Sequence, residues 1–331
     1  MDPATNEVVQ TNNPVDALAP GGHGQFLYHL YFSGKLDEIA QASTQILVMA
    51  NADNINATPN PIIATKMVRD NVMGALVSTD RTPLDTKGGI FVIRNGRLDV
   101  VEMGSVSKKQ QELFTQIGLR EGDATQPFNT NTIYINVPSL LQHLKDLAES
   151  ESEETVHALL MPETIPNKKP AGIQLEGAIS STVLKLPGVR FFNAPTEHRS
   201  DEFTPLKTPI DAVYYLDSDA YAYDTTMHQL QRRRTGPETT FNVGGWDGWK
   251  NVITTRHAFG LPSFKDLNSL TISGKISGPN TIWRGKVQVI NEGEGTLDLT
   301  QVDALQIDEH LTLDNVRVTR AKDGSVNVKP I

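Results

Sequence analysis

Uninterrupted and alternating apolar positions divide the first part of the chain into strands and helices. The run ILVMA at 46–50 has no polar alternation, so it predicts a buried, parallel strand. Further strands are predicted at 74–79, 90–94, 98–103, 127–137 and 189–192, the second and third of these joined by an Asn95-Gly96 hairpin turn. Helical patterns occupy 61–73, 105–117, 138–148 and 173–186. Strands that alternate with helices predict an α/β fold.

The pattern changes at about Pro262. Short alternating strands separated by Gly and Asn follow one another without helices, at 267–276, 281–290, 297–299 and 311–316. This recurrence predicts a stacked-coil β-helix, with a small sandwich as the alternative. We therefore expect one domain at 1–261 and a second at 262–331. The exposed end coils of such a solenoid are a candidate surface for a homo-oligomer.

Composition narrows the class of protein. At 331 residues the chain is long enough for a large core and for two domains. Its net charge of -9 argues against nucleic acid and anionic membranes as partners. The absence of cysteine excludes disulfides, thiolate catalysis and Cys-ligated zinc. No leader pattern opens the sequence and no apolar run approaches the roughly 20 residues that cross a bilayer, so a cytoplasmic protein is expected.

A polar cluster follows the 46–50 run. The carboxyl end of a buried strand is where open α/β sheets bind ligands. Asp53 can hold Mg²⁺, while Asn51 and Asn54 can exchange hydrogen bonds with a base or sugar. The competing interpretation, an Asx turn that closes the strand, accounts for the same residues.

Other candidate ligand residues are spread along the chain. Gly22 and His23 precede a helix, where glycines let a ligand approach backbone amides; a plain turn with a solvent-facing His23 is the alternative. Asn129 and Asn131 lie two apart, on one face of an extended chain, and suit sugar hydroxyls. Glu102, near a strand end, can bind hydroxyls or be a solvated edge residue.

Basic residues offer two candidate phosphate contacts. Lys207 beside Thr208 can neutralise a phosphate as a point charge, although ordinary surface lysines look the same in sequence. The cluster at 232–234 (RRR) can contact a phosphate or a partner, but a solvated helix face is the favoured interpretation.

The order of these motifs carries a family resemblance. From Pro20 onward the chain reads PGGHGQF, NADN, KGG, VVEMGSV, FNTNTIYIN, IQLEGAI and FTPLKTPID, followed by the strand-rich tail. This succession resembles the UTP-glucose-1-phosphate uridylyltransferase family, the UDP-sugar pyrophosphorylases. The resemblance implies a Rossmann-like nucleotidyltransferase mixed sheet with helices on both faces, followed by a left-handed β-helix-like domain.

The resemblance also implies an activity. Such enzymes form UDP-glucose or a related UDP-sugar and pyrophosphate from UTP and a sugar 1-phosphate such as glucose 1-phosphate, with Mg²⁺. Asp53 and Lys207 would be catalytic, Asp53 as the metal ligand and Lys207 on the phosphates. The residues implied for nucleotide binding are Gly22, His23 and Asn54, and those for the sugar are Gly89, Glu102, Asn129 and Asn131.

The chain departs from the family pattern in three places. Gln25 stands where the family commonly has an acidic residue, and Pro209-Ile210 interrupts the usual Lys-Thr-Thr-Ser-Asp. The Gly-rich nucleotide loop expected upstream of Pro20 is not found, so at least one βαβ unit, about 30 residues, is expected to be missing. Two hypotheses follow: an enzyme represented by its carboxyl-terminal part, or a catalytically incompetent nucleotide-sugar binding or assembly subunit.

Overall fold

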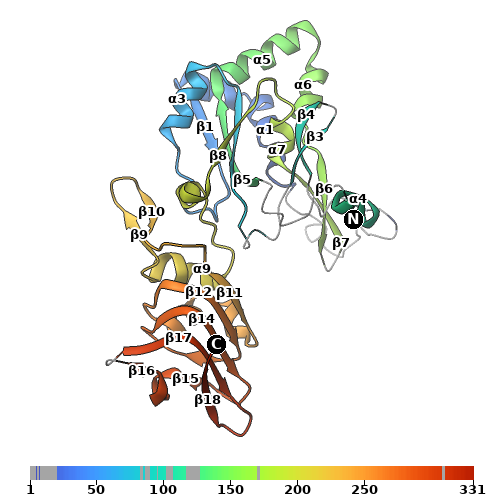
Figure 1. The fold of residues 1–331 in the computed structure, drawn as a ribbon. Coiled ribbons are helices and arrows are strands. Elements are labelled where there is room, and N and C mark those ends of the chain that lie inside the picture. The colour runs from blue at the N-terminus through green and yellow to red at the C-terminus, as the bar shows by residue number, and fades with distance from the viewer. Residues whose placement is uncertain are drawn as a thin grey trace. The chain divides into compact units, whose positions relative to one another are not determined.

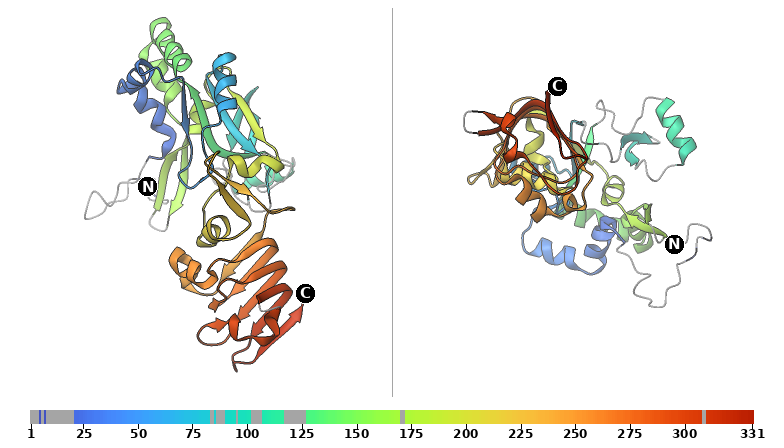
Figure 2. Two further views of the ribbon diagram at one scale, coloured as in Figure 1. Left: turned by 90° about the vertical axis from the view of Figure 1, so that its left-hand side faces the viewer. Right: turned by 90° about the horizontal axis from the view of Figure 1, so that it is seen from below.

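The computed structural model describes most of the chain as two compact units (Figures 1 and 2). The described residues are Thr5, Glu7, 21–82, Asp85, 90–94, 96–101, 107–116, 127–169, 172–307 and 310–331. Unit 1 takes in the described residues up to Asn51 together with Pro59–Glu197, and unit 2 comprises Ala52–Thr58 and His198–Ile331. The short segment 52–58 therefore belongs to unit 2, although unit 1 residues flank it in sequence.

A four-stranded mixed sheet forms the centre of unit 1. Its strand order is β1 (Ile46–Met49), β5 (Phe128–Asn136), β2 (Gly74–Thr79) and β8 (Arg190–Ala194). β5 runs antiparallel to β1 and β2, whereas β2 and β8 are parallel. The helices of this unit are α1 (Phe26–Phe32), α2 (Lys35–Gln41), α3 (Pro61–Arg69), α4 (Lys108–Gln116), α5 (Val137–Ser150), α6 (Glu153–Leu160) and α7 (Ile179–Val183). The mixed α/β class is confirmed.

Helices cover both faces of this sheet (Figure 1). On one face Leu76 and Ile133 pack with Leu36 of α2 and Leu140 of α5. On the other face Val77 and Tyr134 pack with residues of α3. The helix starts are explained by their caps, since Asn60 and Asn136 accept backbone hydrogen bonds immediately before α3 and α5.

The prediction of a buried parallel strand at 46–50 was wrong in two respects. β1 is an edge strand, antiparallel to β5, and each of its residues is only half-buried. Leu47 and Met49 nevertheless contact one core while Ile46 and Val48 contact the other. An all-apolar run thus indicates that both faces of the strand are covered. It does not indicate the direction of the strand or its position in the sheet.

Two hairpins complete unit 1. β3 (Ile90–Arg94) pairs antiparallel with β4 (Arg97–Val101), and the backbone register pairs residue 94 with residue 97, which confirms the predicted hairpin. β6 (Thr164–Lys169) pairs with β7 (Gly172–Gly177), and the helix predicted at 173–186 was therefore wrong over its first half. Ile173 and Leu175 alternate with Gln174 and Glu176, a period of two that belongs to a strand.

Parallel strands dominate unit 2. β11 (Thr240–Gly244), β12 (Ser263–Ser273), β14 (Ile282–Asn291) and β17 (His310–Arg320) pair parallel in that order, and β18 (Val326–Pro330) joins β17 antiparallel. The shorter strands are β9 (Tyr221–Asp224), β10 (Gln229–Arg232), β13 (Ile276–Ser277), β15 (Leu297–Asp298) and β16 (Gln306–Ile307); the helices are α8 (Arg199–Glu202), α9 (Pro209–Ala212) and α10 (Val252–Phe259), with the π-helix η5 (Val213–Asp217).

Register explains how these strands make a core. Leu270 and Ile272 of β12 face Val287 and Val289 of β14, so apolar side chains stack from strand to strand. Tyr214 and Phe259, from the segment before β12, pack on the same core. This shared core explains why His198–Phe259 belongs to the same compact unit as the strands that follow. The domain boundary expected at 261/262 stays a prediction.

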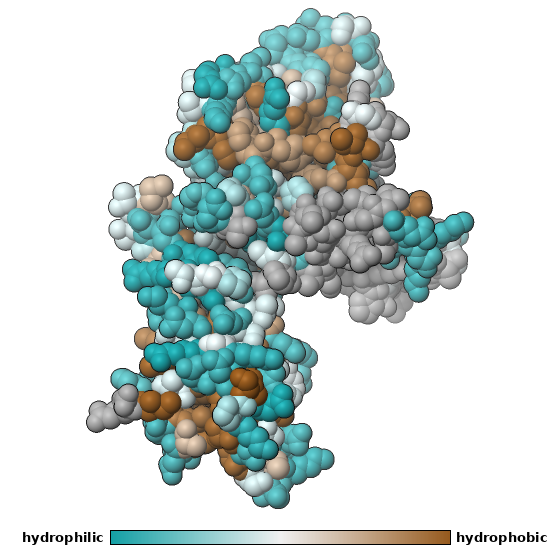
Figure 3. Space-filling view, in the orientation of Figure 1, coloured by the Kyte–Doolittle hydropathy of each residue, from teal (hydrophilic) through white to brown (hydrophobic). Residues whose placement is uncertain are grey.

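The face shown in Figure 3 carries both polar and apolar areas on each unit. The most exposed large apolar side chains of the described residues include Ile62 and Ile93 in unit 1 and Leu261 in unit 2. Among the described helices, none combines the length and the apolar character that crossing a membrane requires.

The centre of the unit 2 core gives a stability prediction. Trp283 is fully buried against Phe259 and Phe264, and its indole Nε1 has no partner among the described residues. Trp283→Ala should lower the free energy of unfolding by roughly 3–5 kcal/mol through the cavity it leaves. Trp283→Phe should cost much less, because it removes a buried donor that makes no hydrogen bond. Urea denaturation measures the free energy of unfolding of both variants. Equal losses in Trp283→Ala and Trp283→Phe would contradict the central packing role given to this indole.

Candidate functional site

Residues 52–58, here called the strap, pair with the loop that follows α8 in unit 2. The amide of Leu206 donates to the carbonyl oxygen of Asp53 at 2.8 Å, and the amide of Ile55 donates to the carbonyl of Thr204 at 3.2 Å. Asn54 and Pro205 form an antiparallel bridge between these two bonds. The polar cluster after β1 is therefore divided: Asn51 belongs to unit 1, whereas Asp53 and Asn54 lie in a short strand-like segment of unit 2.

Two buried asparagines fix the strap. Asn54 accepts from the amide of Thr204 at 2.8 Å and donates to the carbonyl of Glu202 at 2.9 Å. Asn56 binds both the amide and the carbonyl of Leu230 of β10, each at 2.9 Å, and also donates to Ser200. The amide of Asn54 is thus used inside the protein, and its predicted contact with a nucleotide stays a prediction. Asn56 was missed, although its two-residue spacing from Asn54 is the signal of one strand face.

Asp53 and Lys207 lie together in unit 2. Lys207 Nζ donates to Asp53 Oδ2 in an ion pair between a carboxylate side chain that is 33% exposed and a lysine side chain that is 56% exposed. The second carboxylate oxygen, Asp53 Oδ1, is buried and has no hydrogen-bond partner within the described residues. The two residues predicted to be catalytic are thus brought into direct contact.

The backbone of Lys207 is held by the start of helix α9. Thr208 is the N-cap, Pro209 the first helical residue, and the Asp211 carboxylate closes a capping box. Asp211 Oδ2 accepts from the amides of Lys207 at 2.8 Å and Thr208 at 2.6 Å. Burial raises the pKa of Asp211, and these backbone hydrogen bonds oppose the shift. The lysine therefore projects from an ordered helix start.

A second group of predicted residues meets in unit 1. His23 Nδ1 accepts from the amide of Ile179 at 3.1 Å, and its Nε2 lies 3.2 Å from Asn131 Nδ2. Asn131 also donates to Asn51 Oδ1 at 2.8 Å. Four of the sequence motifs thus converge on one set of side chains. Desolvation lowers the pKa of His23, and the nearby Glu176 opposes that shift.

The two asparagines of FNTN are not on a regular strand, so the expected extended geometry was wrong. β5 bulges between the pairs Val77–Thr132 and Ser78–Asn129, and Asn131 has a φ of 59°. Thr130 holds the bulge by donating to the carbonyl of Val77 at 2.7 Å. Such bulges redirect side chains, and here Asn131 is directed toward His23 and Asn51.

The glycines around His23 permit close packing against β7. Gly22 has a φ of 79°, and a Cβ there would lie 2.7 Å from the carbonyl oxygen of Gly177. A Cβ on Gly24 would lie 2.5 Å from the carbonyl carbon of Gly177. The turn that carries His23, η2 (His23–Gln25), therefore requires glycine on both sides of the histidine.

The remaining predicted residues have mixed outcomes. Gly89 and Glu102 lie outside the described residues. The solvated helix face predicted at 232–234 was wrong: Arg232 ends β10 and pairs with Glu238 at 3.1 Å, and Arg234 is buried and donates to the carbonyl of Leu267 at 2.5 Å.

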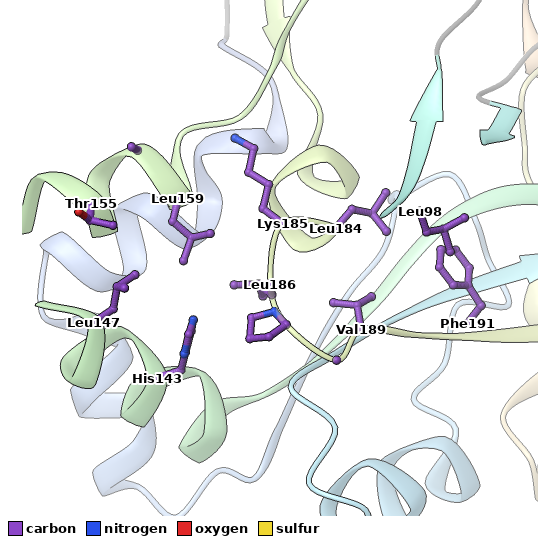
Figure 4. A pocket seen from close by; sticks show the side chains of 13 residues that line it. Leu98, His143, Leu147, Thr155, Leu159, Leu184, Lys185, Leu186, Val189 and Phe191 are labelled. Atoms are coloured by element: carbon purple, nitrogen blue, oxygen red, sulfur yellow. The ribbon is translucent and has the colours of Figure 1, made fainter. Parts of the chain in front are cut away.

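An apolar pocket of about 640 Å³ lies elsewhere in unit 1 (Figure 4). It is lined by Leu147 of α5, Leu159 of α6, the segment 184–189 and Phe191 of β8. None of the predicted site residues that the structure describes lines it, so the candidate site formed by these residues is distinct from this pocket.

The sequence matches a family model. The model described as UTP–glucose-1-phosphate uridylyltransferase covers residues 2–283, most of the chain. The chain belongs to the UTP–glucose-1-phosphate uridylyltransferase family.

Individual relatives give the extent of the match. The UTP–glucose-1-phosphate uridylyltransferase of Saccharomyces cerevisiae is 27% identical over 304 residues, which cover 89% of this chain and 56% of that protein. That of Encephalitozoon cuniculi is 28% identical, covering 82% and 52%. This chain thus spans little more than half the length of these relatives.

Solved structures match in fold. The UDP-glucose phosphorylase of Trypanosoma brucei has a TM-score of 0.73 and 25% identity, covering 94% of this chain and 64% of that one. A UDP-glucose pyrophosphorylase variant of Leishmania major, in complex with UDP-glucose, has a TM-score of 0.72 and 23% identity with the same coverage.

The contacts of His23 predict a pH dependence of stability. Protonation would turn the accepting Nδ1 into a donor facing the amide of Ile179, consistent with a folded-state pKa below the ordinary 6.5. Neutral His23 therefore contributes fully to stability above pH 6.5, and this contribution is lost as the pH falls through the lower pKa of His23 in the folded state. Lowering the pH from 7.5 to 5.5 should reduce the free energy of unfolding, measured with urea, by less in His23→Gln than in wild type. The exposed His310→Gln is the control; an unchanged loss in His23→Gln would contradict the assignment.

Proposed function

We propose that this chain carries out uridylyl transfer, in which UTP and glucose 1-phosphate, or a related sugar 1-phosphate, give a UDP-sugar and pyrophosphate. Family membership supports the reaction class. The observation that carries the proposal for this chain is the contact between Asp53 and Lys207, which joins a carboxylate and a cation on an ordered loop. The chain spans 56% of the length of the Saccharomyces cerevisiae relative, and we propose the activity named for that relative for this chain as well.

The proposed role of Lys207 is to neutralise phosphate. In this reaction a sugar phosphate oxygen attacks the α-phosphorus of UTP in line as pyrophosphate leaves, and positioning and charge neutralisation supply most of the rate. Lys207 Nζ is a mobile point charge suited to a phosphate oxygen, while its backbone is fixed by Asp211. Only the side chain has to move to meet the substrate.

The donor set at Asp53 fits Mg²⁺. Asp53 Oδ1 is a buried carboxylate oxygen without a partner in the described chain, so its lone pairs are uncommitted. Mg²⁺ is commonly held by one or two carboxylates together with phosphate oxygens and water. No group of three or more His, Cys, Asp or Glu suited to a metal occurs among the described residues, which disfavours an all-protein site there. When bound, the ion would neutralise charge that develops on the leaving pyrophosphate.

The unit 1 residues are proposed to recognise the sugar and the nucleotide. Asn129 uses its Oδ1 to accept from the amide of Asn131 at 3.1 Å, which leaves its amino group as a donor for a hydroxyl. Asn131 and His23 lie side by side, with Asn131 Nδ2 3.2 Å from His23 Nε2, and are assigned to the sugar and the nucleotide respectively. The roles of Gly22, Gly89 and Glu102 stay predictions from the family resemblance.

We also propose the finer fold class. The sheet of unit 1 is assigned to the Rossmann-like nucleotidyltransferases, supported by its helices on both faces. The carboxyl-terminal strands are assigned to a β-helix, supported by the parallel register of β12, β14 and β17 and by the separate parallel pair of β13 and β15.

The test of the proposed function is pyrophosphate release by the purified chain from UTP, glucose 1-phosphate and Mg²⁺. Asp53→Ala and Lys207→Ala should each lower kcat by roughly 10²- to 10³-fold, because each removes charge stabilisation of the transition state. Matched controls are Asp247→Ala and Lys250→Ala, which break an exposed ion pair and should leave the rate unchanged.

Circular dichroism would check that each variant is folded. A folded wild-type chain that releases no pyrophosphate would overturn the proposal and would favour a nucleotide-sugar binding or assembly subunit.

A further inference from the structure

The apolar pocket of unit 1 has a chemistry of its own (Figure 4). Its volume of about 640 Å³ is typical of cavities that enclose a small molecule, which range from roughly 300 to 1,000 Å³. Helices α5 and α6, the segment 184–189 and one residue each of β4 and β8 form its walls. The apolar lining includes Leu147, Leu159, Leu184, Leu186, Val189 and Phe191.

This apolar lining is incompletely covered by the protein itself. Leu98, at one wall, is 37% exposed. Leu147, Leu159 and Phe191 are only half-buried. Apolar surface that is removed from water contributes about 25 cal/mol per Å². A ligand with an apolar body would therefore gain free energy by covering these side chains.

The charged residues of the lining are all basic. Lys185 and His143 contribute to the pocket wall, whereas no Asp or Glu does. The chain as a whole has 39 acidic residues against 30 lysines and arginines, so a lining without a carboxylate departs from its average surface. A pocket that carries one sign of charge attracts ligands of the opposite sign. The complementary ligand is therefore an anion.

Neither basic side chain is neutralised by the described residues. Lys185 Nζ donates to the carbonyl oxygen of Met161, which follows α6, at 2.5 Å, and forms no ion pair with a described carboxylate. An ammonium has three N–H donors, so two are available. His143 makes no hydrogen bond with the described chain. In Figure 4 the two basic side chains lie on opposite sides of Leu159 and Leu186.

We propose that this pocket binds a small amphipathic carboxylate, with its apolar chain against the leucine side chains and its carboxylate at Lys185. The two available donors of the ammonium form charge-assisted hydrogen bonds with the carboxylate, and such bonds are stronger than neutral ones. The carbonyl of Met161 holds the ammonium at the pocket wall. This inference does not depend on uridylyl transfer, because none of the described candidate-site residues lines the pocket.

The test is calorimetric titration of the full chain with two probes of equal chain length and opposite charge. These are decanoate and decyltrimethylammonium, both kept below their micelle concentrations. We expect a single decanoate site and roughly tenfold weaker binding of the cationic probe, because the Lys185 ammonium repels it. Equal affinity for the two probes would mean adsorption to apolar surface alone and would overturn the proposal, as would the absence of decanoate binding.

Three variants locate the bound probe. Lys185→Met keeps the apolar stem, removes the charge and should weaken decanoate binding by about tenfold without weakening binding of the cationic probe. Ala158→Trp, at an exposed position of α6 in the lining, should abolish binding of decanoate by filling the pocket. Lys145→Met is the matched control, because this exposed lysine of α5 pairs with Asp37 outside the lining and should not affect binding.

Each variant has an outcome that contradicts the assignment. Decanoate affinity that is unchanged in Lys185→Met would reject the carboxylate contact. Unchanged affinity in Ala158→Trp would place the bound probe elsewhere and reject the pocket. A loss in Lys145→Met equal to that in Lys185→Met would reduce the effect to net charge and would also overturn the proposal.

Discussion

The pairing of the strap 52–58 with residues 204–206 is the interaction on which the candidate chemistry of unit 2 depends. Two backbone hydrogen bonds and the amides of Asn54 and Asn56 hold seven residues that are flanked on both sides by unit 1 sequence. Removing either amide would leave buried backbone groups without partners, at a cost of about 1–3 kcal/mol each. The strap fixes the backbone of Asp53, and the capping box of α9 fixes that of Lys207.

Irregular backbone carries the candidate groups in both units. In unit 1 a bulge with a left-handed Asn131 and a glycine-flanked turn at His23 bring together residues that are over 100 positions apart. In unit 2 a strap and a helix start do the same for Asp53 and Lys207. The regular sheets and parallel strands supply the buried support, and the candidate side chains occupy the points where that regularity is broken.

Sequence pattern predicted the elements better than it predicted their pairing. The stacked strands after Pro262 and the β3–β4 hairpin followed from local alternation, and the motif order identified the family. The edge position of β1, the bulge at Asn131 and the buried role of Asn56 did not follow, because each depends on partners distant in sequence. Arg234 shows the same limit, since a basic cluster looks solvated until its burial against Leu267 is known.

Amide hydrogen exchange in Asn56→Ala tests the role of the strap most directly. In this variant the amides of Ile55 and Leu206, which bridge the strap and the 204–206 segment, should exchange roughly tenfold faster than in wild type. The amide of Gly274, bonded to Gly244 elsewhere in unit 2, should be unaffected, as should all three in the exposed control Asn242→Ala. Unchanged protection of Ile55 and Leu206 in Asn56→Ala would contradict the claim that this asparagine holds the strap that positions Asp53.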